Sequence, residues 1–190
     1  MDLLQRFDDS VILFLDSIRG ISFIDSLMKF ISFLGNGGWF YILIGIVMIC
    51  FIKKYPKVGK WGIVLLISLA ISAIIVNLGI KPYVARIRPF DRLMLDIIID
   101  TPHDYSFPSG HTTAAFGAAV VFMYMNKKIG FIMLIFAVLM GFSRMYLMVH
   151  FPTDVICGAL IGTVVSVIVC NIYINKIQNS EAVVCNNDDM

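Results

Sequence analysis

Long uncharged apolar runs, separated by short polar segments, make up most of this chain. Trp61–Ile80 has 20 residues without a charge, and Val155–Asn175 has 21. A helix needs about 20 apolar residues to cross the hydrocarbon core of a bilayer. Two further runs, Ser109–Asn126 and Ile129–Ser143, are uncharged apart from one histidine. The pattern predicts an all-α fold, an integral membrane helical bundle.

A fifth run, Phe30–Ile52, has 23 residues without a charge. The segment Gly35-Asn36-Gly37-Gly38 interrupts it, and clustered glycines mark a turn. We therefore expect this span to begin near Gly38 or Trp39. Together the runs predict five transmembrane helices.

The first 34 residues contain two apolar segments, Leu3–Ile18 and Ile21–Leu34, that carry charges. These charges include Asp8, Asp9, Asp16, Arg19, Asp25 and Lys29. A charge at the bilayer centre costs at least about 2.5 kcal/mol, whereas an amphipathic helix can lie in the interface. We therefore expect residues 1–34 to form amphipathic interfacial helices. The alternative, one more crossing, gives six spans.

Composition agrees with a membrane protein of one domain. The chain has 190 residues, of which 59% are hydrophobic and only 15% charged, while soluble domains are about a quarter charged. The net charge of +2, without a long basic tract, gives no reason to expect a nucleic-acid partner. The four cysteines favour thiols in the membrane core over a disulfide framework. We expect no cleaved signal peptide.

Lysines in short connections predict the orientation in the membrane. They are Lys53, Lys54, Lys57, Lys60, Lys127, Lys128 and Lys176. An alternating path puts them all on one side, which should be the cytoplasm. The transmembrane core, residues 35–176, then has its long loop, residues 81–108, and the turn around His150 on the extracytoplasmic side. Residues 177–190 form a polar tail for which we expect no fixed structure.

Three polar clusters interrupt the apolar pattern, and the first contains Lys81, Arg86 and Arg88-Pro89. A guanidinium grips phosphate with two parallel hydrogen bonds, and a lysine adds a point charge. If the preceding span continues as a helix, Lys81 and Arg88 lie two turns apart on one face. The alternative is a juxtamembrane cluster that reaches into lipid headgroups.

The second cluster, Pro108-Ser109-Gly110-His111, precedes an apolar run and predicts a helix start. Unpaired backbone N–H groups at such a start favour an anion. The alternative is an ordinary serine N-cap followed by an incidental histidine.

The third cluster is Ser143-Arg144, then His150 and Asp154. Because His150 and Asp154 are four residues apart, the carboxylate can hold Nδ1–H and leave Nε2 nucleophilic. Phe151-Pro152 should break the helix, so we expect His150 in a turn. The alternative is a pair of interfacial anchors. On the predicted topology all three clusters face one side of the membrane.

The spacing Lys81-x6-Arg88-Pro89, then Pro108-Ser109-Gly110-His111, then Ser143-Arg144-x5-His150-x3-Asp154 resembles the three-part signature of the type 2 phosphatidic acid phosphatase superfamily. Every defining position is present, and the resemblance covers roughly residues 21–175.

The resemblance implies a membrane phosphatase that needs no metal or other cofactor. His150 would attack phosphorus and become a phosphohistidine, while Asp154 orients it. His111 would protonate the leaving oxygen and then activate water. The implied phosphate-binding residues are Lys81, Arg88, Ser109, Gly110 and Arg144.

Members of this superfamily act on phosphatidylglycerophosphate, phosphatidate, undecaprenyl diphosphate or lipid A. The resemblance therefore implies a lipid phosphate or prenyl diphosphate as substrate, and the small size and short loops favour a bacterial cell membrane. The oligomeric state stays open. A phosphotransferase, which passes the phosphoryl group to another acceptor, is an alternative, as is a transporter or scaffold without enzymatic activity. Soluble acid phosphatases and vanadium haloperoxidases share this anion site, but the apolar runs argue against them.

Overall fold

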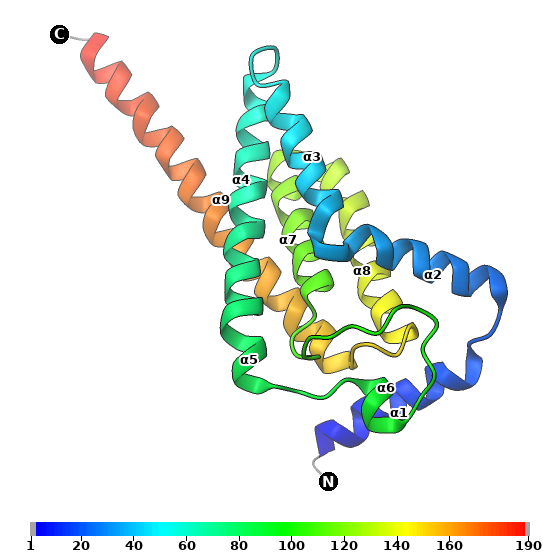
Figure 1. The fold of residues 1–190 in the computed structure, drawn as a ribbon. Coiled ribbons are helices and arrows are strands. Elements are labelled where there is room, and N and C mark those ends of the chain that lie inside the picture. Colours follow the sequence, from blue (N-terminus) through cyan, green and yellow to red (C-terminus); the bar gives the residue numbers. More distant parts are fainter. Residues whose placement is uncertain (1–2, 189–190) are drawn as a thin grey trace.

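The computed structural model describes residues 3–188, with side chains for residues 3–177. Over this range the chain is helical and has no strand, which confirms the all-α prediction. The central helix is α7 (Gly110–Met125), which packs against α8 (Lys127–Tyr146), α9 (Pro152–Asp188) and α4 (Pro56–Ala73) (Figure 1). Helix α3 (Trp39–Cys50) packs along α4. Helix α9 continues through residues 177–188, so the expectation of no fixed structure was wrong for this part of the tail, and residues 189–190 lie outside the described residues.

Four segments of the described chain are long and apolar enough to cross a membrane: Ser22–Cys50, Pro56–Leu93, Lys127–Tyr146 and Pro152–Ile177. They support a multi-pass membrane protein. The central helix α7 has only 16 residues, which is short for a complete crossing. The count of five spans therefore stays a prediction.

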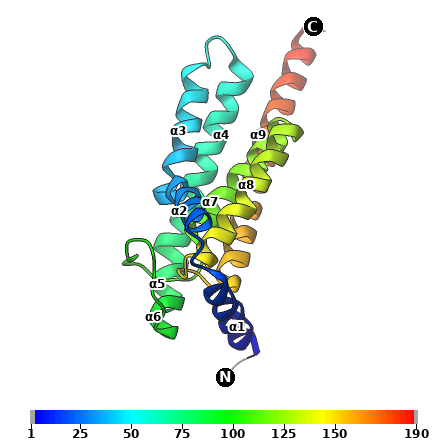
Figure 2. The same ribbon diagram turned by 90° about the vertical axis from the view of Figure 1, so that its right-hand side faces the viewer.

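The N-terminal region forms two separate helices, α1 (Leu3–Ile18) and α2 (Ser22–Gly35). Helix α2 runs across the direction of the bundle (Figures 1 and 2). A short 3-10 turn, η1 (Asn36–Gly38), joins it to α3, and Gly37 and Gly38 have φ values of 56° and 71° there. Glycine adopts such left-handed backbone at no steric cost. The predicted start of a helix at Trp39 is confirmed, while the interfacial position of α1 and α2 stays a prediction.

The first polar cluster does not lie on one helix face, so that expectation was wrong. Helix α4 continues through the π-helical segment η2 (Ile74–Ile80) into α5 (Lys81–Val84), and Ala85 with φ 47° ends it. Arg88 has extended backbone and precedes the short helix α6 (Pro89–Leu93). Lys81 and Arg88 therefore approach each other through a turn in the chain.

Two glycines of α9 allow this helix to pack closely against α7. A Cβ on Gly162 would lie 2.1 Å from the carbonyl oxygen of Thr113, and one on Gly158 would lie 2.6 Å from that of Ser109. Small residues of this kind let helix backbones approach closely. At the end of this contact the backbone N–H of Ser109 donates to the carbonyl oxygen of Asp154 at 3.1 Å. The second and third polar clusters are joined in this way.

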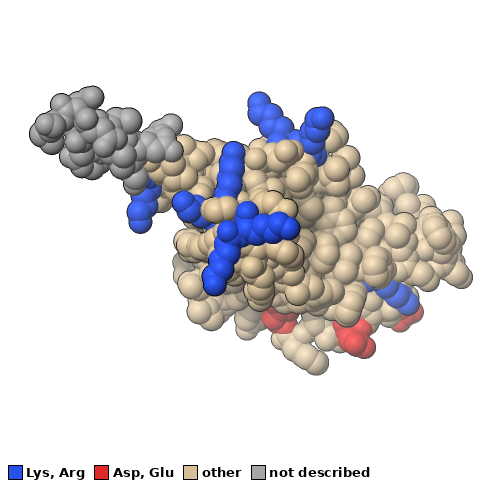
Figure 3. All heavy atoms as spheres, turned by 90° about the horizontal axis from the view of Figure 1, so that it is seen from above, with Lys and Arg blue, Asp and Glu red and all other residues tan. Residues whose placement is uncertain are grey.

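The two ends of the bundle differ in charge. The α3–α4 and α7–α8 connections, with their lysines, lie at one end (Figure 1). Figure 3 views this end and shows Lys and Arg side chains gathered on it. The three signature clusters lie at the opposite end, near α5, α6 and α1 (Figure 2). This separation agrees with the predicted path of the chain, but which end faces the cytoplasm stays a prediction.

Candidate active site

A polar cavity of about 540 Å³ lies at the end of the bundle where the signature clusters meet. Five of the eight predicted site residues line it: Lys81, Arg88, His111, Arg144 and His150. The rest of its wall comes from α2, from Asn36 in η1 and from the loop before α7. The structure therefore brings cations and imidazoles from all three clusters into one cavity.

Arg88 is buried, with only 4% of its surface exposed, and is fixed by backbone contacts. Its Nε donates to the carbonyl oxygen of Asp104 at 2.8 Å and its Nη1 to that of Val149 at 2.6 Å. The same Nη1 lies 3.4 Å from Nε2 of His150. The guanidinium thus lies beside the ring nitrogen for which the resemblance implies nucleophilic attack.

Asp104 forms ion pairs with Lys81 and Arg88, two of the residues that we predicted to bind phosphate. Its carboxylate accepts a hydrogen bond from Nη2 of Arg88 at 2.5 Å and pairs with the ammonium of Lys81. Burial alone would raise the pKa of Asp104, but the hydrogen bond and charge of Lys81, together with Arg88, lower it to about 2. An internal carboxylate therefore pairs with two of the cations for which the resemblance implies phosphate binding. The signature gave no hint of it.

His150 is fully buried and lies in a turn after α8, as predicted from Phe151-Pro152. Burial lowers its pKa to about 3; Asp154 opposes this effect, while the nearby charges of Arg88 and Arg144 add to it. The imidazole is therefore neutral near pH 7, with one nitrogen lone pair free to react.

Asp154 faces His150 without a hydrogen bond. Its Oδ2 lies 3.6 Å from Nδ1 of His150, and Nδ1 has no hydrogen-bond partner among residues 3–177. The same Oδ2 accepts from the Ser106 hydroxyl at 2.5 Å and from the backbone N–H of Phe151 at 2.8 Å. The expected hydrogen bond between Asp154 and His150 is thus not formed, because the two atoms are too far apart. Catalytic pairs often show such long distances before substrate binds.

Arg144 is buried near the end of α8 and reaches α2. Its Nη1 donates to the hydroxyl of Ser32, while its Nε has no partner among the described side chains. Arg144 also lines the cavity, so its guanidinium combines a buried, unpaired donor with a position at the cavity wall.

His111 opens α7 and packs against the end of α2. Its Nε2 lies 2.9 Å from Oδ1 of Asn36, and a carbonyl oxygen accepts only from a protonated ring nitrogen. A Cβ on Gly35 would lie 2.5 Å from the ring, so a glycine is needed at that position. Sequence reasoning did not find Ser32 or Asn36, because neither belongs to a motif.

Ser109 and Gly110 are not among the residues that line the polar cavity. The Ser109 hydroxyl caps α7 and accepts from Oγ1 of Thr112 at 2.9 Å. Gly110 lines a neighbouring apolar cavity instead. Contact of these two residues with phosphate stays a prediction.

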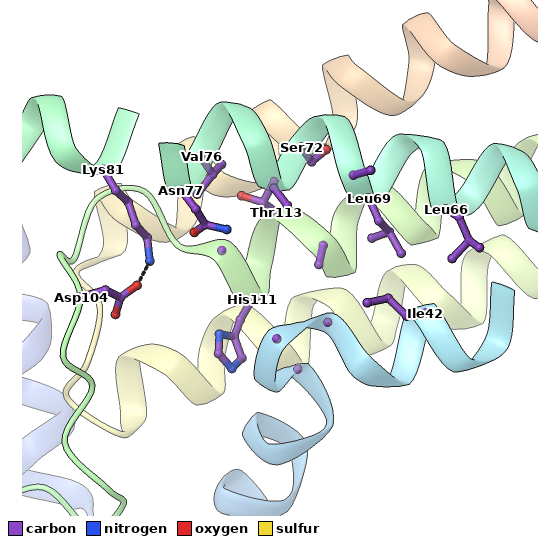
Figure 4. A pocket seen from close by; sticks show the side chains of 17 residues that line it. Ile42, Leu66, Leu69, Ser72, Val76, Asn77, Lys81, Asp104, His111 and Thr113 are labelled. Atoms are coloured by element: carbon purple, nitrogen blue, oxygen red, sulfur yellow. Dashed lines mark hydrogen bonds and ion pairs between the residues drawn. The ribbon is translucent and has the colours of Figure 1, made fainter. Parts of the chain in front are cut away.

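That apolar cavity, of about 490 Å³, lies between α3, α4 and α7. Figure 4 shows Lys81, Asp104 and His111 at one end and Leu69, Leu66 and Ile42 toward the other. The first three also line the polar cavity. An apolar space therefore opens directly beside the cations and imidazoles.

A helical membrane bundle with such a site belongs to a known class. The model of the PAP2 superfamily matches residues 61–178. The chain is 35% identical to an undecaprenyl-diphosphatase of Sulfolobus acidocaldarius, over 77% of this chain and 69% of that protein. It is 32% identical to the undecaprenyl-diphosphatase BcrC of Bacillus subtilis, over 76% and 72%.

The fold is also similar to that of a solved structure. A PAP2-type phosphatidylglycerolphosphate phosphatase from Bacillus subtilis aligns with a TM-score of 0.78 and 24% identity, covering 92% of this chain and 88% of the other. The chain belongs to the PAP2 superfamily, and within it to the membrane lipid phosphatases. The predicted resemblance is confirmed.

Proposed function

We propose that this protein hydrolyses a phosphate monoester or diphosphate of a membrane lipid through a phosphohistidine at His150. The observation that carries the proposal is the pair of adjoining cavities, one with cations and imidazoles and one apolar. Their chemistry fits an anionic headgroup joined to a hydrocarbon chain. Undecaprenyl diphosphate and glycerolipid phosphates are the substrate classes that we favour.

In the first step Nε2 of His150 forms a bond to phosphorus while the bond to the leaving oxygen breaks. His111, in its imidazolium form, donates a proton to that oxygen, so that it leaves as a neutral hydroxyl or as a lipid phosphate. Lys81, Arg88 and Arg144 stabilise the charge on the equatorial oxygens. Since Asp104 already engages two of these cations, the phosphoryl group has to displace its carboxylate.

In the second step water attacks the phosphohistidine. His111, now neutral, takes the proton from the water, and the phosphorus–nitrogen bond breaks to release inorganic phosphate. His111 returns to its starting protonation state over the two steps, because the proton that it gives to the lipid is replaced by one from water. Among residues 3–177 no three His, Cys, Asp or Glu side chains form a group that could hold a metal ion.

The lipid chain would enter the apolar cavity between α3, α4 and α7. Ala70 lines this cavity, whereas Ile71, its neighbour on α4, does not. Ala70→Phe should raise KM for a long-chain lipid phosphate several-fold and leave a short water-soluble phosphate ester unaffected. Ile71→Phe serves as the matched control. An equal effect on both substrates would count against this cavity as the site of the chain.

The experiment that tests the function is a panel assay of the purified protein in detergent with EDTA. Phosphate release would be measured from undecaprenyl diphosphate, phosphatidylglycerophosphate, phosphatidate and lipid A. Release from at least one substrate by the wild type, and none by His150→Ala, is the expected result. Adding an alcohol acceptor distinguishes the alternative, because a phosphotransferase would form a new phosphate ester.

A further inference from the structure

Helix α1 lies outside the residues that the superfamily model matches, yet one of its side chains contacts residues directly behind the active site. Asp8 is only 1% exposed, although it belongs to an amphipathic helix near the N-terminus. A buried carboxylate needs partners that compensate for its loss of water. Those partners lie on α9 and on the segment before Arg88.

Both oxygens of Asp8 accept hydrogen bonds from distant parts of the chain. Oδ1 accepts from the backbone N–H of Thr153 at 3.0 Å. Oδ2 accepts from the Thr153 hydroxyl at 2.5 Å and from Nη2 of Arg86 at 2.6 Å. Asp8 thus holds the first turn of α9 and one arm of Arg86 together.

The other arm of Arg86 binds the carboxylate that faces His150. Its Nη1 donates to Oδ1 of Asp154 at 2.5 Å and to the hydroxyl of Thr153 at 2.8 Å. The guanidinium also stacks on the ring of Phe151, 4.2 Å from the ring centre. A planar fork with five N–H donors can hold two carboxylates in fixed directions, whereas a lysine offers one compact ammonium without that geometry.

Asp154 is therefore held on both sides. Ser106 and the backbone of Phe151 fix its Oδ2, and Arg86 fixes its Oδ1. The carboxylate cannot turn toward or away from the imidazole of His150 unless one of these contacts changes. Arg86 thus contacts Asp154, and α1 contacts Arg86 through Asp8 and, at 3.3 Å, through Gln5.

We propose that Asp8 and Arg86 are positioning residues of this enzyme, and that α1 is a functional part of the active site. Asp8 holds Arg86, Arg86 holds Asp154, and Asp154 orients His150 for attack. This inference rests on the proposed function of His150 and Asp154. Neither Asp8 nor Arg86 lines the polar cavity, so both act through other side chains.

The test compares Asp8→Asn with Asp16→Asn in the full-length protein in detergent. Asp16 is the matched control, because it lies on the same helix and pairs only locally, with Arg19 at 2.6 Å. A misplacement of about 1 Å in a catalytic group can cost 100-fold in rate. Asp8→Asn should therefore lower kcat about 10- to 100-fold while KM changes less than about threefold. Asp16→Asn should match the wild type.

Two further measurements separate positioning from a loss of folding. Arg86→Ala should regain activity when guanidinium is added at low concentration, and the wild type should not respond. Asp8→Asn and Arg86→Lys should also be non-additive, since both break one chain of contacts. A loss of kcat without a change in melting temperature would support the proposal as well.

The outcomes are distinct. If the wild type releases phosphate from none of the lipid phosphates, the proposed function is wrong and this inference falls with it. If the wild type is active and Asp8→Asn keeps its kcat, the inference alone is overturned. The same holds if Asp8→Asn lowers activity only in proportion to the fraction of protein that has unfolded.

Discussion

Asp104 should compete with the substrate for Lys81 and Arg88, so its neutralisation should tighten substrate binding. The carboxylate pairs with both cations, and these contacts hold its pKa at about 2 instead of the ordinary 3.8. A depressed pKa means that the stabilising contribution of the pair is complete above about pH 4. It is lost only as the pH falls through about 2. At neutral pH the competition is therefore fully present, and only a substitution removes it.

The size of the effect follows from this pKa. The lowering from 3.8 to about 2 corresponds to roughly 2 kcal/mol. The Asp104 side chain is 54% exposed, and solvent screens such a pair, so about 1 kcal/mol is a better value. Asp104→Asn should thus lower KM, and the inhibition constant of inorganic phosphate, about fivefold.

The assay is phosphate release at pH 7 from one lipid phosphate, with phosphate as inhibitor. Asp100→Asn is the control, because Asp100 lines the same cavity and carries the same charge. An equal change in both variants would indicate a general effect of charge. A rise in KM together with a large loss of kcat in Asp104→Asn would refute the reasoning, because Asp104 would then be needed to arrange the two cations.

Four other outcomes are expected. His150→Ala should lose all turnover while the protein still inserts and folds, and retention of more than a few per cent of activity would contradict its role as nucleophile. His111→Ala should keep residual activity toward an aryl phosphate, whose leaving group needs less protonation; an equal loss of activity on substrates with good and with poor leaving groups would count against His111 as the acid. Vanadate should inhibit competitively and bind less tightly to Arg144→Lys, while activity should persist in excess EDTA; loss with EDTA and restoration by Mg²⁺ would rule out the proposed mechanism. Cysteines at Lys57 and Asp100, in a background without the native four, should react oppositely with an impermeant thiol reagent, and labelling of Lys57→Cys in intact cells would reverse the orientation.

Much of the local structure could be predicted from the sequence, because each feature depends on neighbouring residues. Uncharged runs predicted the helices, and the glycines at positions 37 and 38 predicted the start of α3 at Trp39. Phe151-Pro152 predicted that His150 would lie in a turn. That cations and imidazoles from three distant clusters share one cavity was implied by the resemblance to the superfamily and not by local sequence, and their roles stay a prediction.

The tertiary structure alone decided which distant side chains meet at the site. Asp104 lies on an irregular loop, where no periodicity predicts its direction, and its pairing with Lys81 depends on how that loop folds back. Asp8 contacts a residue 145 positions away, Thr153, so its role depends on where α1 packs. The left-handed backbone at Ala85 likewise ends the helix, which the sequence suggested could continue to Arg88. Apolar runs specify that helices form, but the orientation of single polar groups is set by long-range packing.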